Sequence, residues 1–287
     1  MNPDEAVLLW VDEYTRMADA YEANVVPRFA PFAEALVSRA GPKPHSTVLD
    51  VSTGTGLTAL LAAEAMGGTG LVVGIDLSDG ALAVAQTKAA RSGLRNLRFE
   101  MLDSRNIVYR GGAFDAALCS FGIPAVGHAQ VFREVHRVLK DGATFHALGW
   151  GPRAPEAGWD AFEEALAARQ TPTPSRALAQ LREAADLFAS SGDAAATRDP
   201  HAVTAKLREA GFSEVSAESV EAVVSFGTLE DLITYHASFG RTERELAEMG
   251  DPAAVELRQD LGARLAASRD ADGVRLRWSL VRYAAAK

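Results

Sequence analysis

The chain has 287 residues, of which 48% are hydrophobic and 23% charged, and its net charge is −9. This composition is typical of a globular protein with a sizeable core. No run rich in Lys and Arg occurs, so we expect no nucleic-acid partner, because proteins that bind phosphate backbones usually carry a basic stripe. The single Cys119 excludes an internal disulfide and a cysteine-based zinc site, and we expect no metal centre.

The first residues give no targeting signal. Residues 1–18 include several acidic side chains and lack the basic start and apolar core of a signal peptide. No apolar run approaches the roughly 20 residues that span a bilayer. We therefore expect a cytoplasmic protein with no membrane partner.

The order of the predicted elements indicates the fold class. Helical periodicity covers residues 4–40, and a Gly-Pro-Lys-Pro stretch at 41–44 ends it. Short apolar strands then alternate with helices, as in a parallel sheet covered on both faces. We expect strands at 47–51, 71–75, 97–101, 114–119 and 143–148, and helices at 57–66, 80–92 and 130–139. The pattern predicts a Rossmann-like α/β fold.

Beyond residue 150 the chain becomes Ala-rich and helical, with proline interruptions. A strand at about 213–226, helices at about 229–269 and a last strand at 274–284 complete a seven-stranded, mostly parallel sheet. The predicted segments are N-terminal helices that cover the ligand site (1–44), a ligand-binding core (45–150), a helical cap insertion (151–210), and final strands with a second helical insertion (211–287).

A glycine-rich loop follows the first strand and opens the next helix, at residues 52–57. Glycine lets the backbone turn sharply and approach a ligand closely. The free N–H groups at the start of the helix point back at the loop. This arrangement predicts a ligand with nucleotide character.

The loop alone does not identify the nucleotide. Gly54, Gly56 and Ala59 satisfy the dinucleotide fingerprint, and Asp76 stands about 20 residues on, where that fingerprint places its ribose-binding acid. Against NAD, Ser52 and Thr53 are polar where an apolar strand would run straight into glycine. Asp50 would also repel a pyrophosphate, whereas a ligand with a zwitterionic end and a cationic sulfonium tolerates an acid.

Residues 48–56 resemble motif I of the class I S-adenosylmethionine (SAM)-dependent methyltransferases, and specifically the ubiquinone/menaquinone-biosynthesis type of C-methyltransferase. Residues 73–78, 100–104, 114–122 and 134–142 are similar to the family's later motifs, in register. The resemblance covers 45–150 well. The chain departs from the family at Ser52-Thr53, where small residues are usual, and at Ala143, where a second glycine is usual.

The resemblance implies SAM as cofactor and gives several residues a role. Asp76 would bind both ribose hydroxyls, and Asp103 would contact the adenine amino group. Ser120 follows the fourth strand at the edge where ligands of such sheets collect, and could line the methionine end. The full predicted set of cofactor-binding residues is Asp50, Ser52, Thr53, Gly54, Gly56, Asp76, Leu77, Asp103, Ser104 and Ser120.

The expected reaction is methyl transfer from SAM to carbon or oxygen of an apolar small-molecule acceptor. No motif fixes a general base. His128 after the fourth strand, His236 in the second insertion and Tyr21 in the N-terminal helices are the candidate catalytic residues. Aromatic residues of the later half could line the acceptor pocket or form plain core: Trp159, Phe162, Phe188, Phe226 and Phe239.

Three alternatives stay open at this point. The first is a nicotinamide-dependent oxidoreductase. The second is a nucleic-acid amino-methyltransferase, which is disfavoured because residues 119–122 lack the Asn/Asp-Pro-Pro-Tyr/Phe stretch typical of that class. The third is a SAM-bound enzyme that catalyses a reaction other than methylation.

Overall fold

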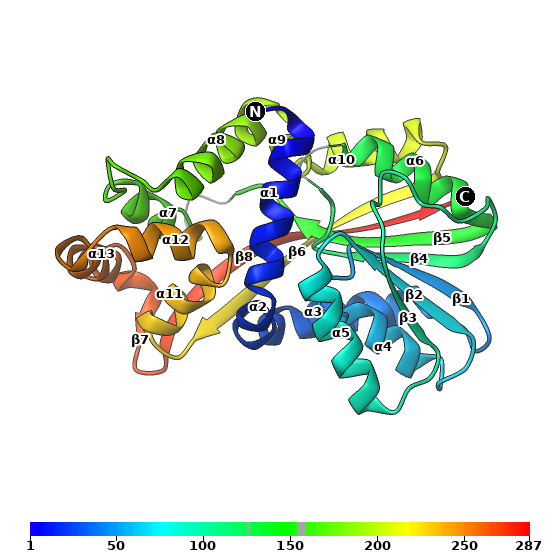
Figure 1. The fold of residues 1–287 in the computed structure, drawn as a ribbon. Coiled ribbons are helices and arrows are strands. Elements are labelled where there is room, and N and C mark those ends of the chain that lie inside the picture. Colours follow the sequence, from blue (N-terminus) through cyan, green and yellow to red (C-terminus); the bar gives the residue numbers. More distant parts are fainter. Residues whose placement is uncertain (125–126, 154–158) are drawn as a thin grey trace.

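A mixed sheet runs through the molecule in the order β3-β2-β1-β4-β5-β8-β6, and the two-residue β7 pairs with β8 (Figure 1). The computed structural model describes residues 1–124, 127–153 and 159–287. Strands β1 to β5 are parallel to one another, whereas β8 is antiparallel to both β5 and β6. This confirms the predicted fold class. The strands are β1 Thr47–Val51, β2 Leu71–Asp76, β3 Leu97–Met101, β4 Phe114–Ser120, β5 Leu139–Trp150, β6 Ser213–Phe226, β7 Arg269–Asp270 and β8 Gly273–Ala286.

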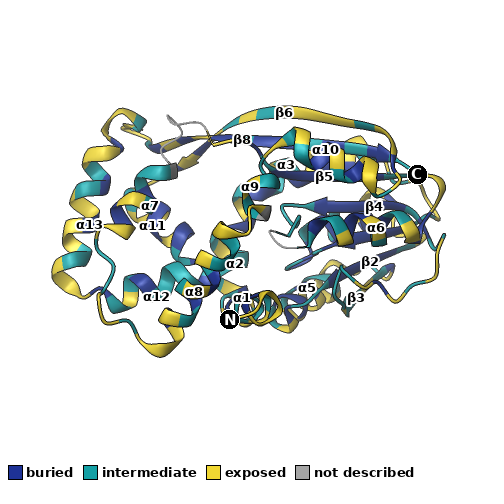
Figure 2. Cartoon of the chain, turned by 90° about the horizontal axis from the view of Figure 1, so that it is seen from above, coloured by how far each residue is buried: buried dark blue, intermediate teal, exposed yellow. Residues whose placement is uncertain are grey.

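Helices cover both faces of the parallel part, because successive strand residues point to opposite sides. Val48, Val72 and Leu118 face α3 and α4, whereas Leu49, Val73 and Cys119 pack on the other side, where α6 and α10 lie. In Figure 2 the inner strands such as β4, β5 and β8 are dark with buried residues, whereas the edge strand β6 is largely exposed and the helices are exposed on their outer sides. The helices of these layers are α3 Val26–Ala40, α4 Leu57–Ala65, α5 Asp79–Ser92, α6 His128–Val138 and α10 Pro200–Glu209.

The fifth strand begins four residues before its expected start at 143. Leu139 has extended backbone angles and is fully buried, and it pairs with Phe114 across an irregularity in the β4–β5 register. Burying Leu139 against Phe114 requires extended backbone at Leu139, so α6 ends at Val138 and β5 begins directly after it.

The β6–β8 hairpin extends beyond the parallel sheet. β5 pairs only with Leu280–Ala286 of β8, so the earlier half of β8 pairs with β6 alone. Phe226 and Trp278 on this extension are buried against α11 and α13, which places a second core beside the sheet. The helices here are α7 Trp159–Ala167, α11 Leu229–Ala237, α12 Gly240–Glu248 and α13 Asp251–Arg264, followed by the short η1 Ala266–Ser268.

Helix α1 (Pro3–Arg16) crosses in front of the carboxyl ends of the parallel strands, and α2 (Ala18–Asn24) follows it (Figure 1). α1 packs on α5, on α8 (Arg176–Ser190) and on α12, while the short α9 is Asp193–Ala196. The buried Glu13 carboxylate accepts hydrogen bonds from Arg16 and Arg244, and Thr15 is hydrogen-bonded to Ser78. α1 therefore has polar attachments to both the sheet side and α12. The division into four segments stays a prediction.

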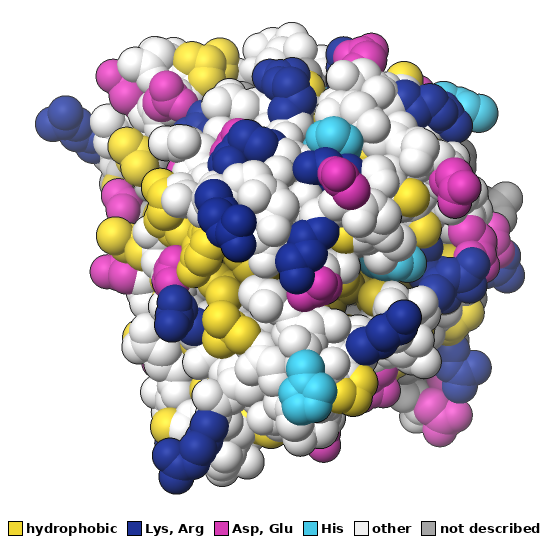
Figure 3. All heavy atoms as spheres, turned by 90° about the vertical axis from the view of Figure 1, so that its right-hand side faces the viewer, with side chains coloured by type: hydrophobic (Ala, Val, Ile, Leu, Met, Phe, Trp, Pro, Cys, Tyr) yellow, Lys and Arg dark blue, Asp and Glu magenta, His cyan; other side chains and the backbone are white. Residues whose placement is uncertain are grey.

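The outer surface carries mixed charge. The face at the amino ends of the parallel strands shows Lys and Arg side chains among acidic, histidine and uncharged ones (Figure 3). Within the described ranges, no helix is both long enough and apolar enough to span a bilayer. The absence of a nucleic-acid partner stays a prediction.

Candidate active site

A cavity of about 500 Å³ opens at the carboxyl ends of β1 to β4, between the sheet and α1. Because β1 lies between β2 and β4, the crossovers reverse direction here, and open α/β sheets bind ligands at such a switch point. The volume lies within the range of small-molecule sites. The predicted cofactor residues that line the cavity are Ser52, Gly54, Asp76, Leu77, Asp103, Ser104 and Ser120.

The loop after β1 adopts the left-handed backbone that its glycines were expected to permit. Gly54 has φ +53° and Gly56 has φ +82°, and even Ser52 takes φ +54°. A Cβ on Gly56 would lie 2.8 Å from Ala85 Cβ, so only glycine fits between α4 and α5. Gly56 thus shapes the loop from behind and does not line the cavity.

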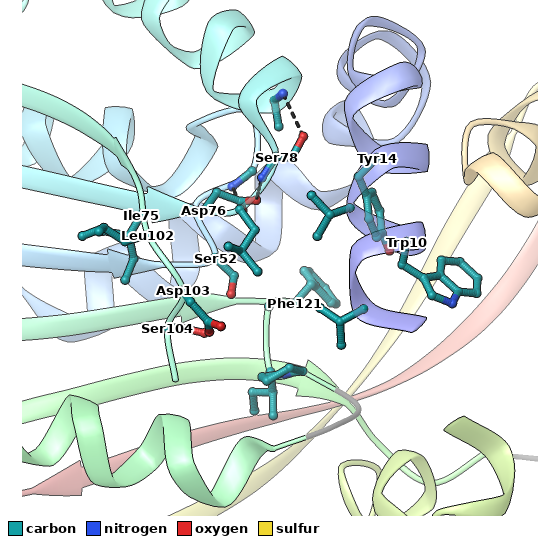
Figure 4. Close-up of a pocket in the computed structure, with 18 of the residues that line it drawn as sticks. Trp10, Tyr14, Ser52, Ile75, Asp76, Ser78, Leu102, Asp103, Ser104 and Phe121 are labelled. Atoms are coloured by element: carbon teal, nitrogen blue, oxygen red, sulfur yellow. Dashed lines mark hydrogen bonds between the residues drawn. The ribbon is translucent and has the colours of Figure 1, made fainter. Parts of the chain in front are cut away.

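Asp76 joins the loop to the end of β2. One of its carboxylate oxygens accepts the Gly54 N–H at 2.8 Å, and the other accepts the Ser78 N–H at 2.9 Å (Figure 4). Each oxygen has two lone pairs, so each keeps one for a ligand hydroxyl. Burial raises the pKa of this carboxyl, while the backbone hydrogen bonds oppose the shift. The geometry fits the ribose diol of SAM.

Asp103 is engaged more completely. Arg105 donates to one of its oxygens from the backbone N–H and Nε, and to the other from Nε and Nη2, at 2.8 to 3.1 Å. Burial raises the pKa of Asp103, but the hydrogen bonds and the charge of Arg105 outweigh it, so the pKa is lowered overall. Nη1 of the same guanidinium reaches Asp4 on α1 at 2.7 Å. An adenine amino group at Asp103 would therefore share this carboxylate with Arg105.

Asp50 and Thr53 lie behind the loop, outside the cavity lining. The Thr53 hydroxyl donates to Asp50 at 2.6 Å, and both residues are buried. Burial raises the pKa of Asp50 to about 7. The argument from Asp50 against a pyrophosphate loses its basis, because this carboxyl does not face the ligand. The extra hydroxyl of Thr53 braces the loop and does not crowd the cavity.

The opposite wall comes from α1 and α2, which the sequence interpretation did not assign to the site in detail. Val7, Trp10, Val11 and Tyr14 line the cavity at helical spacing, and the stripe continues to Tyr21. This spacing of apolar residues by three and four positions was the available signal. Figure 4 shows Tyr14 on α1 across the cavity from Asp76 and Phe121, while the indole of Trp10 on the same helix extends away from Asp76.

Tyr21 is the only one of the three catalytic candidates that lines the cavity within the described chain. Its ring meets the rings of Tyr14, Phe29 and Phe239 edge-on. Burial and the nearby Asp76 raise its pKa well above the usual tyrosine range. It can therefore donate a hydrogen bond at neutral pH but is a poor proton acceptor.

His128 and His236 are placed in packed interiors. His128 is buried beside Phe132 in α6, and His236 stacks on Phe162 with ring centroids 3.9 Å apart. Burial lowers the pKa of His236 to about 3. Neither histidine belongs to the cavity lining. Among described residues, no group of three or more potential ligands is arranged to hold a metal ion.

Of the aromatic candidates for the acceptor wall, Phe188 lines the cavity. Phe162 and Phe226 are core residues, and Phe239 packs on that core. The side chain of Trp159 lies outside the described residues. Phe121 was missed by the sequence interpretation: it follows β4 with φ +56°, stacks on Phe29 at 4.1 Å and reaches the cavity.

Comparison with known proteins gives a consistent answer. Residues 48–142 match a family described as "Methyltransferase domain". Over 268 residues the chain is 31% identical to nocamycin O-methyltransferase of Saccharothrix syringae, which covers 88% of this chain and 91% of that protein. It is 36% identical over 108 residues to the ubiquinone/menaquinone biosynthesis C-methyltransferase UbiE of Brucella anthropi, covering 37% and 41% of the two chains. The YcgJ protein of Bacillus subtilis shares the fold at 16% identity, with a TM-score of 0.58 over 89% of this chain and 98% of that one.

Proposed function

The chain belongs to the class I SAM-dependent methyltransferases, and we propose that it transfers a methyl group to oxygen or carbon of an apolar small molecule. It is an enzyme with SAM as its methyl donor, which sets the nicotinamide alternative aside. The observation that carries the proposal is the division of one cavity into two parts. Asp76 and Asp103 lie on the strand side, and a wall of apolar side chains faces them from α1 and α8.

The strand side would hold the cofactor. Asp76 keeps one lone pair on each oxygen for the ribose hydroxyls, and charge-assisted bonds of this kind are roughly twice as strong as neutral ones. Asp103 would accept from the adenine amino group beside Arg105, and Ser120 would face the methionine end. Asp50, Thr53 and Gly56 would act indirectly, by holding the loop that carries Ser52 and Gly54.

The α1 side would hold the acceptor. Val7, Trp10 and Val11 from α1 and Phe188 from α8 line the cavity there, and none of them carries a charge. When bound, SAM supplies a methyl group that is already activated by its sulfonium. The chain therefore has to exclude water and align the two reactants, which can supply an effective molarity of roughly 10⁵–10⁸ M. The relative that aligns over nearly the whole chain is named as an O-methyltransferase, which supports oxygen as the methylated atom.

The test is turnover with a defined set of acceptors. SAM should bind at about one per chain by calorimetry, and S-adenosylhomocysteine should form when phenols, quinols or polyketides are added. Release of S-adenosylhomocysteine only with added protein or RNA, and with no small molecule in the set, would overturn the proposed acceptor class.

A further inference from the structure

The cavity contains few groups that can take up a proton. Among the described lining residues, the ionisable side chains are Asp76, Asp103, Arg105, Tyr14 and Tyr21. The two aspartates lie on the strand side, where they hold backbone groups and Arg105. The two tyrosines have raised pKa values, because of burial and the nearby Asp76. At neutral pH they are hydrogen-bond donors.

The charge of the cavity also restricts the acceptor. Arg105 is the cation of the described lining, and both Asp103 and Asp4 are ion-paired with it. Because these two carboxylates already balance the charge of Arg105, the guanidinium attracts an anionic substituent such as a phosphate only weakly. A positive charge opposite the apolar wall would come from the sulfonium of bound SAM. That charge attracts an oxygen anion placed beside the methyl group.

The apolar wall favours a flat molecule. Trp10 and Phe188 come from α1 and α8, with ring centroids 6.2 Å apart and planes tilted by 37°. Phe121 contributes a third ring from the loop after β4. Aromatic rings interact well with other planar groups through offset or edge contacts. Ile123 and Pro124, from the loop after β4, also line the cavity and add no polar side chain.

We propose that the acceptor is a planar compound with an acidic hydroxyl, a phenol or the enol of a 1,3-dicarbonyl, which loses its proton to water and not to a side chain. This rests on the proposed function. The acceptor O–H bond breaks and the proton leaves to solvent. A bond then forms between that oxygen and the methyl carbon, while the carbon–sulfur bond breaks and its electron pair stays on sulfur. An aliphatic alcohol, which is too weakly acidic to ionise in this way, is not an acceptor.

The test compares 4-nitrophenol, 4-methylphenol and cyclohexanol as acceptors over a range of pH. Since only the ionised acceptor reacts, kcat/KM should rise with pH up to the pKa of each phenol and then level off. The pH profiles of kcat/KM for the two phenols should therefore have inflections at different pH values, each near the pKa of its phenol. Cyclohexanol should not be methylated. His128→Ala and His236→Ala should leave both inflections in place.

A second readout does not depend on turnover. The anion of 4-nitrophenol absorbs visible light and the neutral form does not. In a complex with sinefungin, which carries an amine in place of the methylated sulfonium, bound 4-nitrophenol should show the spectrum of the anion at pH 8. The spectrum of the neutral phenol there would contradict the inference.

Three further outcomes would overturn it. One is a single inflection at the same pH for both phenols, which would reveal a base on the protein. Another is methylation of cyclohexanol. The third is no methylation of either phenol, or of cyclohexane-1,3-dione as an enolic acceptor, at any pH while SAM binds. If another small molecule is then methylated, the proposed function stands and only the acceptor class is wrong.

Discussion

Arg105 clamps the carboxylate of Asp103 with its backbone N–H, Nε and Nη2, and the Nε N–H is shared between the two oxygens. The guanidinium also reaches Asp4, near the start of α1. The strand side of the cavity and the helix that covers it are thereby joined through one side chain.

Replacing Arg105 with Ala should destabilise the protein in a pH-dependent way. The pKa of Asp103 is lowered in the folded state, so its ion pair stabilises the fold above the ordinary aspartate pKa of about 3.9 and is lost as the pH falls through the lower folded value. We expect a loss of about 1 kcal/mol in the free energy of unfolding at pH 7, measured in urea, and a smaller loss near pH 2. Arg98→Ala, on the exposed Arg98 of β3, is the control. An equal loss at both pH values would contradict this account.

Asp76→Asn should weaken SAM binding by at least about tenfold, because charge-assisted bonds of roughly 1.5–3 kcal/mol each are replaced by weaker ones. The melting temperature without ligand should also fall, since the amide cannot accept from both the Gly54 and Ser78 N–H groups. Calorimetry and thermal unfolding measure the two effects. Asp79→Asn removes the same charge from an exposed position three residues on and should change neither. Unchanged affinity in Asp76→Asn would mean that the ribose is held elsewhere.

Trp10→Ala should raise the KM for the acceptor by roughly tenfold, which corresponds to about 1.4 kcal/mol of lost aromatic contact. The Kd for SAM should change by less than about twofold, because Trp10 lies on the α1 side of the cavity. Leu8→Ala is the matched control, since Leu8 lies on the same helix, 58% exposed and outside the cavity. A larger effect on SAM binding than on the acceptor would place the cofactor against α1.

His236→Phe should leave turnover nearly unchanged and make the protein more resistant to acid. The pKa of His236 is about 3 in the fold and about 6.5 when unfolded, so below pH 6.5 the unfolded chain gains a proton that the folded chain does not. Between pH 7 and pH 5 this lowers the free energy of unfolding of the wild type by on the order of 2 kcal/mol. The variant should not show this decrease. Urea unfolding at the two pH values measures it, with the exposed His201→Gln as control. A tenfold decrease in kcat in His236→Phe would instead indicate that His236 has a catalytic role.

The sequence by itself determined the sheet and the strand side of the cavity. The parallel strands could be located because each is a short apolar run with punctuation on either side. Gly54, Asp76 and Asp103 could be placed together because the carboxyl ends of parallel strands share one edge, whatever the rest of the chain does. These are local patterns followed by a topological rule, and both can be read without knowing the packing.

Only the tertiary structure decided which residues form the α1 side of the cavity and where the side chains of His128 and His236 lie. Trp10 meets Phe188 across 178 positions of chain, and this contact depends on how α1 and α8 pack, which no local pattern specifies. His236 lies on a helix as expected, whereas His128, expected on the loop before a helix at 130–139, is the first residue of α6. The packing of each helix turns its imidazole into a core. The rotation of each helix follows from burying the whole apolar face of the helix, so the direction of one side chain on it is set by distant partners.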